Sequence, residues 1–128
     1  MSGTSLDGLD MAAAEFHFSN SNWNFEIITA ETVPYSKNWE EKLRHSTELT
    51  GEMLARLHSE YGHFTGQKIK KFIKKTGFKP DIIASHGHTV FHQPEKQFTL
   101  QIGNGAAIAS ETEISEPGML HWAVRERL

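Results

Sequence analysis

The sequence predicts an α/β domain, because patterns typical of strands and of helices follow one another along the chain. Residues 9–34 hold two runs in which apolar side chains recur at every second position, as in half-buried strands. Residues 50–77 carry apolar side chains at steps of three and four, as on one face of a helix. A short apolar run over residues 81–84 follows, and this strand–helix–strand order is typical of α/β domains.

The first two strands are predicted to form a β-hairpin. Residues 9–18 alternate in polarity, and residues 23–34 are rich in aromatic and β-branched side chains. The intervening residues 19–22 read Ser-Asn-Ser-Asn, which is a typical turn composition. Two such runs joined by a short polar turn indicate an antiparallel pair.

Two helices are predicted next. Ser36 is a good N-cap for a helix over residues 37–46, and a longer helix begins near Thr50 and ends at Gly77. Gly62 and Gly66 lie inside the longer helix, where glycine costs about 1 kcal/mol relative to alanine. The pair predicts that another backbone or a ligand passes close to that face, with a locally weak helix as the alternative.

Residues 81–84 are expected to form a short buried strand that leads into a loop at residues 85–89. Ligands gather at the carboxyl ends of strands in such sheets, so this loop is predicted to lie beside a ligand. Residues 98–102 form a further strand, and residues 103–105 turn into an alanine-rich helix. That turn suits a phosphate at a helix N-terminus, or it is an ordinary turn.

Composition excludes several classes of function. With 128 residues the chain forms one domain at most, and its formal charge of −3 does not predict a nucleic-acid partner. The absence of cysteine excludes disulfide and thiol chemistry. We find neither an apolar run of membrane-spanning length nor a signal peptide, so a cytoplasmic protein without a membrane partner is expected.

The first ten residues carry the most informative motif of the chain. Glycines and hydroxyl residues precede a strand, a composition that aims backbone N–H groups at an anion. Asp7 and Asp10 do not grip a bare phosphate, but they suit a divalent cation that accompanies one. The motif therefore predicts a metal–nucleotide phosphate site. An ordinary turn at a chain terminus is the alternative.

A second group of candidate residues contains several histidines. His86, His88 and His92 lie within seven residues, but a zinc site needs a fourth ligand and supporting contacts. Imidazoles in such a pattern usually serve as hydrogen-bond partners. We therefore interpret Ser85, His86, His88 and Thr89 as donors to sugar hydroxyls or to a carboxylate.

Three segments together resemble the anhydro-N-acetylmuramic acid kinases. They are residues 2–10, residues 85–94 and residues 99–109, in the order that the family shows. The resemblance implies an α/β architecture that is part of one lobe of the actin-like sugar-kinase fold, which is ribonuclease H-like. It also implies ATP and Mg²⁺ as cofactors and 1,6-anhydro-N-acetylmuramic acid as substrate. It leaves room for a homodimer of the full-length enzyme.

The resemblance also implies site residues. Those holding the ATP phosphates would be Gly3, Thr4, Ser5, Leu6, Asp7, Gly8, Leu9 and Asp10, and Asp7 would contact Mg²⁺ directly or through water. Those lining the substrate cleft would be Ser85, His86, Gly87, His88, Thr89, Gln101, Gly103 and Asn104.

The chain departs from the family pattern at both ends. Family members carry a strand before the first motif, whereas Met1 here begins at the motif itself. The resemblance covers a lobe fragment over residues 1–112 and stops there, before the second lobe and before the aspartate that serves as base. No residue here is assigned that catalytic role, and the fragment alone is expected to be inactive.

The tail over residues 113–128 is expected to be read out of frame. Read two bases later, the codons of His121 and Trp122 must encode Leu, and those of Trp122 and Ala123 must encode Gly. The other codons permit Asp-Phe-Arg-Thr-Gly-Asp-Val-Ala-Leu-Gly-Gly-Gln-Gly-Ala-Pro, which resembles the family's next motif. A divergent but genuine tail is the alternative. The rival function is a non-catalytic phosphate- or sugar-binding module, or a pseudogene product.

Overall fold

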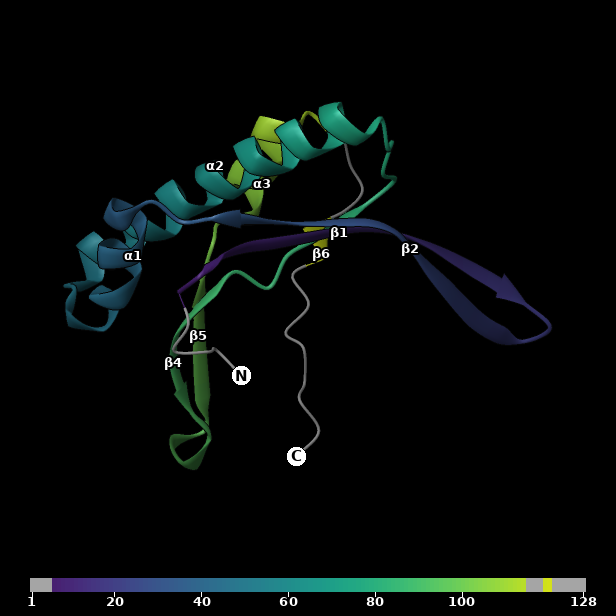
Figure 1. Ribbon diagram of the computed structural model, residues 1–128. Helices are drawn as coiled ribbons and strands as arrows, with labels where there is room; N and C mark the ends of the chain where they lie inside the picture. The colour runs from purple at the N-terminus through teal and green to yellow at the C-terminus, as the bar shows by residue number, and fades with distance from the viewer. Residues whose placement is uncertain (1–5, 115–118, 121–128) are drawn as a thin grey trace.

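The computed structural model describes residues 6–114 and 119–120, which form a mixed α/β arrangement (Figure 1). Its strands belong to three two-stranded sheets, β1–β2, β4–β5 and β3–β6, within the described residues. The elements in chain order are β1 (Gly8–Ser19), β2 (Asn22–Pro34), α1 (Lys37–Arg44), η1 (Ser46–Glu48), α2 (Gly51–Thr76), β3 (Ile83–Ala84), β4 (His88–Gln93), η2 (Pro94–Lys96), β5 (Phe98–Ile102), α3 (Gly105–Thr112) and β6 (Met119–Leu120).

The predicted hairpin is confirmed as the antiparallel pair β1–β2. Asn20 and Ser21 form its turn with φ of 50° and 62°, the left-handed values that a two-residue hairpin turn requires. The register shifts once, between Ala13 and Ala14. This bulge divides the hairpin into a half near the helices and a distal half.

Both predicted helices are confirmed, with their caps. The Ser36 hydroxyl accepts the N–H of Trp39 at the start of α1, and the Thr50 hydroxyl accepts the N–H of Met53 at the start of α2. Gly77 ends α2 with φ of 71°. α1 ends at Arg44, two residues before the predicted end, because the chain turns into η1 at Ser46.

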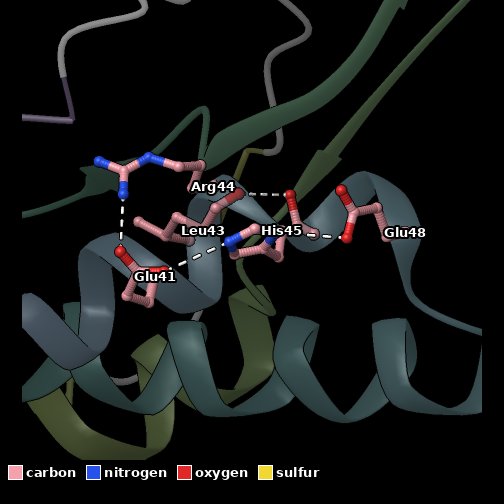
Figure 2. A network of polar contacts seen from close by, with 6 residues as sticks. Glu41, Leu43, Arg44, His45 and Glu48 are labelled. Atoms are coloured by element: carbon pink, nitrogen blue, oxygen red, sulfur yellow. Dashed lines mark hydrogen bonds and ion pairs between the residues drawn. The ribbon is translucent and has the colours of Figure 1, made fainter.

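Figure 2 shows the polar contacts that fix this corner after α1. Glu41 accepts from Arg44 at 2.7 Å and lies 3.3 Å from the His45 ring, whose other nitrogen lies 3.3 Å from Glu48. The buried Ser46 hydroxyl donates to the carbonyl of Leu43 at 2.7 Å. The corner keeps Leu43 in the core, where it is 2% exposed.

The close approach predicted from the two glycines is confirmed, because α3 packs against α2 at both positions. A Cβ on Gly62 would lie 2.5 Å from the Asn104 carbonyl oxygen. A Cβ on Gly66 would lie 2.7 Å from the Glu111 Cβ and 3.0 Å from the Ile108 Cα. Only glycine lets the two helices come this close.

The region after α2 differs from the prediction. The expected buried strand over residues 81–84 is reduced to β3, and its neighbour Ile82 is 48% exposed, so the prediction of a buried strand is wrong. β3 pairs only with the two residues of β6, in parallel, and no layer covers Ile82 among the described residues. β2 and β3, which flank α2 in the chain, do not pair with each other.

The pairing of β4 with β5 was not predicted. The two strands form an antiparallel hairpin through η2, which ends at Gln97 with φ of 63°. In Figure 1 this hairpin extends away from α2 and α3, across the direction of β1 and β2.

One hydrophobic core joins these elements. It consists of Leu43 from α1, Leu57 and Tyr61 from α2, Val90 from β4 and Ile102 from β5. Leu6 packs against it, so the described start of the chain lies on the core that also anchors β4 and β5. None of the helices described here is long and apolar enough to cross a membrane.

Candidate site at the first turns of helix α2

A single turn of α2, from His58 to Gly62, holds the segment that follows β5. The N–H of Gly103 donates to Nδ1 of His58 at 3.0 Å, and the N–H of Asn104 donates to the His58 carbonyl oxygen at 3.0 Å. Gly62 leaves room for the backbone of Asn104. We call this contact region, comprising His58, Tyr61, Gly62, Gly87, Gly103 and Asn104, the junction.

The loop before β4 packs onto the same point. Gly87 has φ of 70°, and a Cβ there would overlap the carbonyl oxygen of Ile102. A Cβ on Gly103 would lie 3.3 Å from the Gly87 Cα and 3.3 Å from the Tyr61 ring. The two segments predicted to line a cleft, residues 85–89 and 101–104, are therefore in direct contact.

The N-terminal segment reaches the junction through Tyr35. The N–H of Tyr35 donates to the Asp7 carbonyl oxygen at 3.3 Å, and the Tyr35 hydroxyl lies 2.7 Å from the Tyr61 hydroxyl. The Asp7 side chain is exposed, whereas Asp10 accepts a hydrogen bond of 2.5 Å from the Thr32 hydroxyl. Two acidic residues thus lie on the segment that Tyr35 connects to α2.

Burial shifts the pKa of three aromatic or imidazole groups at or beside the junction toward the neutral form. Burial raises the pKa of Tyr61 well above the usual range of a phenol, and it also raises the pKa of Tyr35. Burial lowers the pKa of His88, whose ring meets the Tyr61 ring edge-on at 6.3 Å. His58 accepts the Gly103 N–H at Nδ1, so its proton is placed on Nε2.

Comparison with known proteins identifies the family. A family model described as anhydro-N-acetylmuramic acid kinase matches residues 1–120. The chain belongs to the anhydro-N-acetylmuramic acid kinase family. It is 35% identical over 132 residues to the protein of that name from Pseudoalteromonas translucida, covering 92% of this chain and 33% of the relative.

Relatives with the same name occur in other bacteria. Those from Bacillus cereus (strain G9842) and Bacillus anthracis (strain CDC 684) are each 32% identical over 123 residues, covering 88% of this chain and 32% of the relative. The chain therefore spans about a third of the length of these curated relatives. The family resemblance inferred from the three motifs is confirmed.

Most of the residues that the kinase resemblance singles out can be located. Gly3, Thr4 and Ser5 lie outside the described residues. Gly8 and Leu9 begin β1, and a Cβ on Gly8 would overlap the carbonyl oxygen of Val33 on β2. Gly8 is thus required for the close pairing of the two strands.

The polar side chains of the cleft segments bond to one another. The Ser85 hydroxyl accepts the Gly87 N–H at 3.3 Å, and the Gln101 amide donates to the Thr89 hydroxyl at 3.2 Å across the β4–β5 pair. The Asn104 side-chain oxygen caps α3 by accepting the N–H groups of Ala106 and Ala107 at 2.9 and 3.3 Å. His86 is exposed at the loop.

Metal-binding groups are dispersed in the part of the chain that the structure describes. No three of its His, Asp and Glu side chains are clustered as a metal site would require. The ring of His92 serves instead as a hydrogen-bond partner, 2.9 Å from the Thr99 hydroxyl. A cation at Asp7 would therefore take its other ligands from water, from a nucleotide or from residues outside the described set.

Sequence reasoning did not select His58, Tyr35 or Tyr61. Tyr61 is one of the apolar side chains that recur at steps of three and four along residues 50–77, and nothing local marks Tyr35 as its partner 26 positions earlier. Gly62 was the available signal, because it marked the turn of α2 against which a backbone packs. Its neighbours at positions 58 and 61 face the same contact.

Proposed function

We propose that this chain contributes the phosphate-binding and sugar-binding segments of an anhydro-N-acetylmuramic acid kinase. The reaction of the full enzyme would use ATP and water to open the 1,6-anhydro ring of 1,6-anhydro-N-acetylmuramic acid and phosphorylate its 6-oxygen. The products would be N-acetylmuramate 6-phosphate and ADP, in cytoplasmic recycling of cell-wall sugars. The observation that supports this proposal most is the contact of two motif segments at one turn of α2, joined by Tyr35 to the third.

The acidic end of the site is assigned to the nucleotide. Residues 3–10 would hold the ATP phosphates, and the exposed carboxylate of Asp7 fits a role at Mg²⁺, directly or through water. Mg²⁺ bound there would neutralise negative charge that develops on the phosphates. The Tyr35 N–H holds the Asp7 carbonyl oxygen and so fixes the backbone that carries this carboxylate.

The neutral part of the site is assigned to the sugar. Burial lowers the pKa of His88 and so favours its uncharged ring. An uncharged ring can donate or accept a hydrogen bond without attracting the negatively charged ATP phosphates to the sugar end of the site. Thr89 and Gln101 lie side by side on β4 and β5 and orient each other through their hydrogen bond. These groups, with Ser85 and His86 on the loop, offer polar atoms in one neighbourhood for hydroxyl recognition.

We further propose that the 128-residue chain is not catalytic by itself. No residue in it is assigned as the base that activates water, and transfer of a phosphoryl group depends on positioning by the whole constellation. A coupled assay of ADP release, run with ATP, Mg²⁺ and the anhydro sugar, should give no signal above the rate without sugar. Sugar-dependent ADP release would overturn this part of the proposal.

The reading of residues 113–128 as a frameshift is tested by sequencing the gene across codons 112–117. We expect that the gene, when read two bases later from this point, continues as a kinase coding sequence. If the continuation is absent, the tail is genuine.

Asp7→Asn in the frame-restored full-length enzyme tests the phosphate assignment. We expect turnover to fall by about a hundredfold or more while the melting temperature changes little, because Asp7 is exposed. Asp81→Asn, at another exposed acid, is the matched control and should leave turnover unchanged. If the Asp7→Asn variant and the wild-type enzyme had equal turnover, Asp7 would not belong to the phosphate site.

The alternative function is a non-catalytic module that binds phosphate or sugar. Calorimetric titration of the chain separates the two. Weak, Mg²⁺-dependent ATP binding supports a kinase-derived phosphate site. Tight binding of inorganic phosphate or of the sugar alone supports the module.

A further inference from the structure

One residue of α2, His58, holds two consecutive N–H groups of the segment that follows β5. Its Nδ1 accepts the N–H of Gly103, and its carbonyl oxygen accepts the N–H of Asn104, both at 3.0 Å. The carbonyl oxygen of a helix residue normally accepts only from the residue four positions later, which here is Gly62. Because Gly62 has no side chain, the Asn104 backbone can also reach that oxygen, and a Cβ on Gly62 would lie 2.7 Å from the Asn104 nitrogen. His58 and Gly62 together fix the start of this segment on α2.

The N–H groups around the start of α3 are engaged within the protein. Those of Gly103 and Asn104 donate to His58, and those of Ala106 and Ala107 donate to the Asn104 side-chain oxygen at 2.9 and 3.3 Å. A helix N-terminus binds a phosphate through N–H groups that have no partner in the helix or its cap. Because these donors are already engaged, the turn over residues 103–105 is better suited to an uncharged ligand than to a phosphate.

This turn sets the position of the polar groups that lie just before it. Gln101 precedes Gly103 at the end of β5, and its amide donates to the Thr89 hydroxyl at 3.2 Å across the β4–β5 pair. A Cβ on Gly87 would overlap the Ile102 carbonyl oxygen, so the loop before β4 packs directly on the end of β5. A shift of Gly103 along α2 would therefore move Gln101 and Thr89 together.

We propose that His58 is a positioning residue for the sugar, because its Nδ1 holds the Gly103 turn on α2 and so keeps Thr89 and Gln101 in place for a neutral, hydroxyl-bearing ligand. The inference rests on the proposed function, which assigns these two groups to the sugar. The hydrogen bond needs a lone pair on Nδ1, so the ring acts in its neutral form. Asparagine carries an acceptor oxygen on Cγ, at the place of Nδ1, whereas the amide of glutamine extends to the place of Nε2. These two substitutions therefore separate the Nδ1 acceptor from the rest of the side chain.

Amide hydrogen exchange tests the contact on the chain itself. His58→Gln should speed exchange at Gly103 by about tenfold relative to exchange at Leu57 in the core, whereas His58→Asn should leave this ratio near the wild-type value. His63→Gln is the matched control, because His63 lies on the same helix and reaches α3 through Glu111 at 2.8 Å instead. It should leave the ratio unchanged. If His58→Gln had no effect on the ratio, or if His58→Asn changed it equally, Nδ1 would not hold the turn and the proposal would be overturned.

Steady-state kinetics of the frame-restored full-length enzyme then tests the link to the sugar. His58→Gln should raise the KM for the anhydro sugar by about tenfold and leave the KM for ATP unchanged, and His58→Asn should restore the sugar KM. His63→Gln should leave both KM values unchanged. A lower melting temperature without a selective rise in the sugar KM, or an equal rise in both KM values, would overturn the proposal. A wild-type enzyme without sugar-dependent turnover would instead overturn the proposed function, and exchange at Gly103 would still decide whether His58 holds the turn.

Discussion

The junction on α2 and the distal end of the β1–β2 hairpin respond to opposite constraints. At the junction, Gly62, Gly87 and Gly103 bring backbones together so closely that an added methyl group would overlap another chain segment or press against it. At the hairpin end, side chains as large as Trp23 remain mostly in solvent. Close backbone packing therefore determines the structure of the candidate site, whereas strand register alone places the exposed apolar side chains at the end of the hairpin.

This difference separates two kinds of sensitivity to mutation. A change at the junction alters a native conformation that several segments share, so its cost appears as lost stability. A change among the exposed side chains at the hairpin end touches few neighbours, so it should alter the free energy of unfolding little. Phe25→Ser, at a side chain that is 67% exposed, should therefore cost little free energy of unfolding, whereas the glycine and tyrosine substitutions below should cost more.

Gly87→Ala should have the largest effect on stability. Its φ of 70° disfavours alanine, and the new Cβ would overlap the carbonyl oxygen of Ile102. We expect a loss of about 3 kcal/mol or more in the free energy of unfolding, measured by urea denaturation. Gly51→Ala is the control, because a Cβ there meets nothing within 4 Å, and it should be neutral or slightly stabilising. Equal effects at both glycines would contradict the close approach.

The hydroxyl pair of Tyr35 and Tyr61 should contribute a smaller, coupled amount. Tyr61→Phe leaves the half-buried Tyr35 hydroxyl without this partner, and Tyr35→Phe does the reverse, so each should cost about 1–2 kcal/mol. The double variant should cost clearly less than the two single effects together. Additive losses of unfolding free energy would show that the two hydroxyls act independently.

Local chemistry allowed much of the fold to be predicted. The polar turn and flanking alternation predicted the β1–β2 hairpin, and Ser36, Thr50 and Gly77 marked helix ends that the structure confirms. These signals act within a few residues of the chain, so one sequence contains them in full.

The features that the sequence did not predict share a physical cause. Each depends on contacts with residues that are distant in the chain. The pairing of β4 with β5 and the reduction of the 81–84 strand depend on what packs beside them, and the linking role of Tyr35 depends on a residue in another element. The candidate site was predicted from motif resemblance, and the contact between its segments emerged only from the three-dimensional arrangement. Gly62 alone hinted at that contact before its partner was known.

The half-buried ring of His88, which contacts the Tyr61 ring, should make the stability of this region depend on pH. Its pKa is lowered from 6.5 by burial, so between 6.5 and the folded value the unfolded chain binds a proton that the folded chain does not. Stability from neutral His88 is therefore complete above pH 6.5 and is lost as pH falls through that window. His88→Gln removes this contribution, so the wild-type advantage in melting temperature should shrink from pH 7.5 to pH 5. If the difference in melting temperature between the wild type and His88→Gln were constant from pH 7.5 to pH 5, the predicted direction of the pH dependence would be wrong.

The smallest effect is expected on the polar face of the hairpin, at the pair of like charges. Glu15 and Glu26 lie directly opposite each other in the antiparallel register, an arrangement that is destabilising. Glu26→Lys replaces repulsion with attraction and should stabilise the hairpin by about 0.5 kcal/mol, while Glu26→Gln should give about half of that. The rate of amide hydrogen exchange in β1 and β2 measures this change locally, whereas the exchange rate in α2 near His58 should stay the same. Equal changes at both places would show that the hairpin end and the junction unfold as one unit, which would remove the contrast between them.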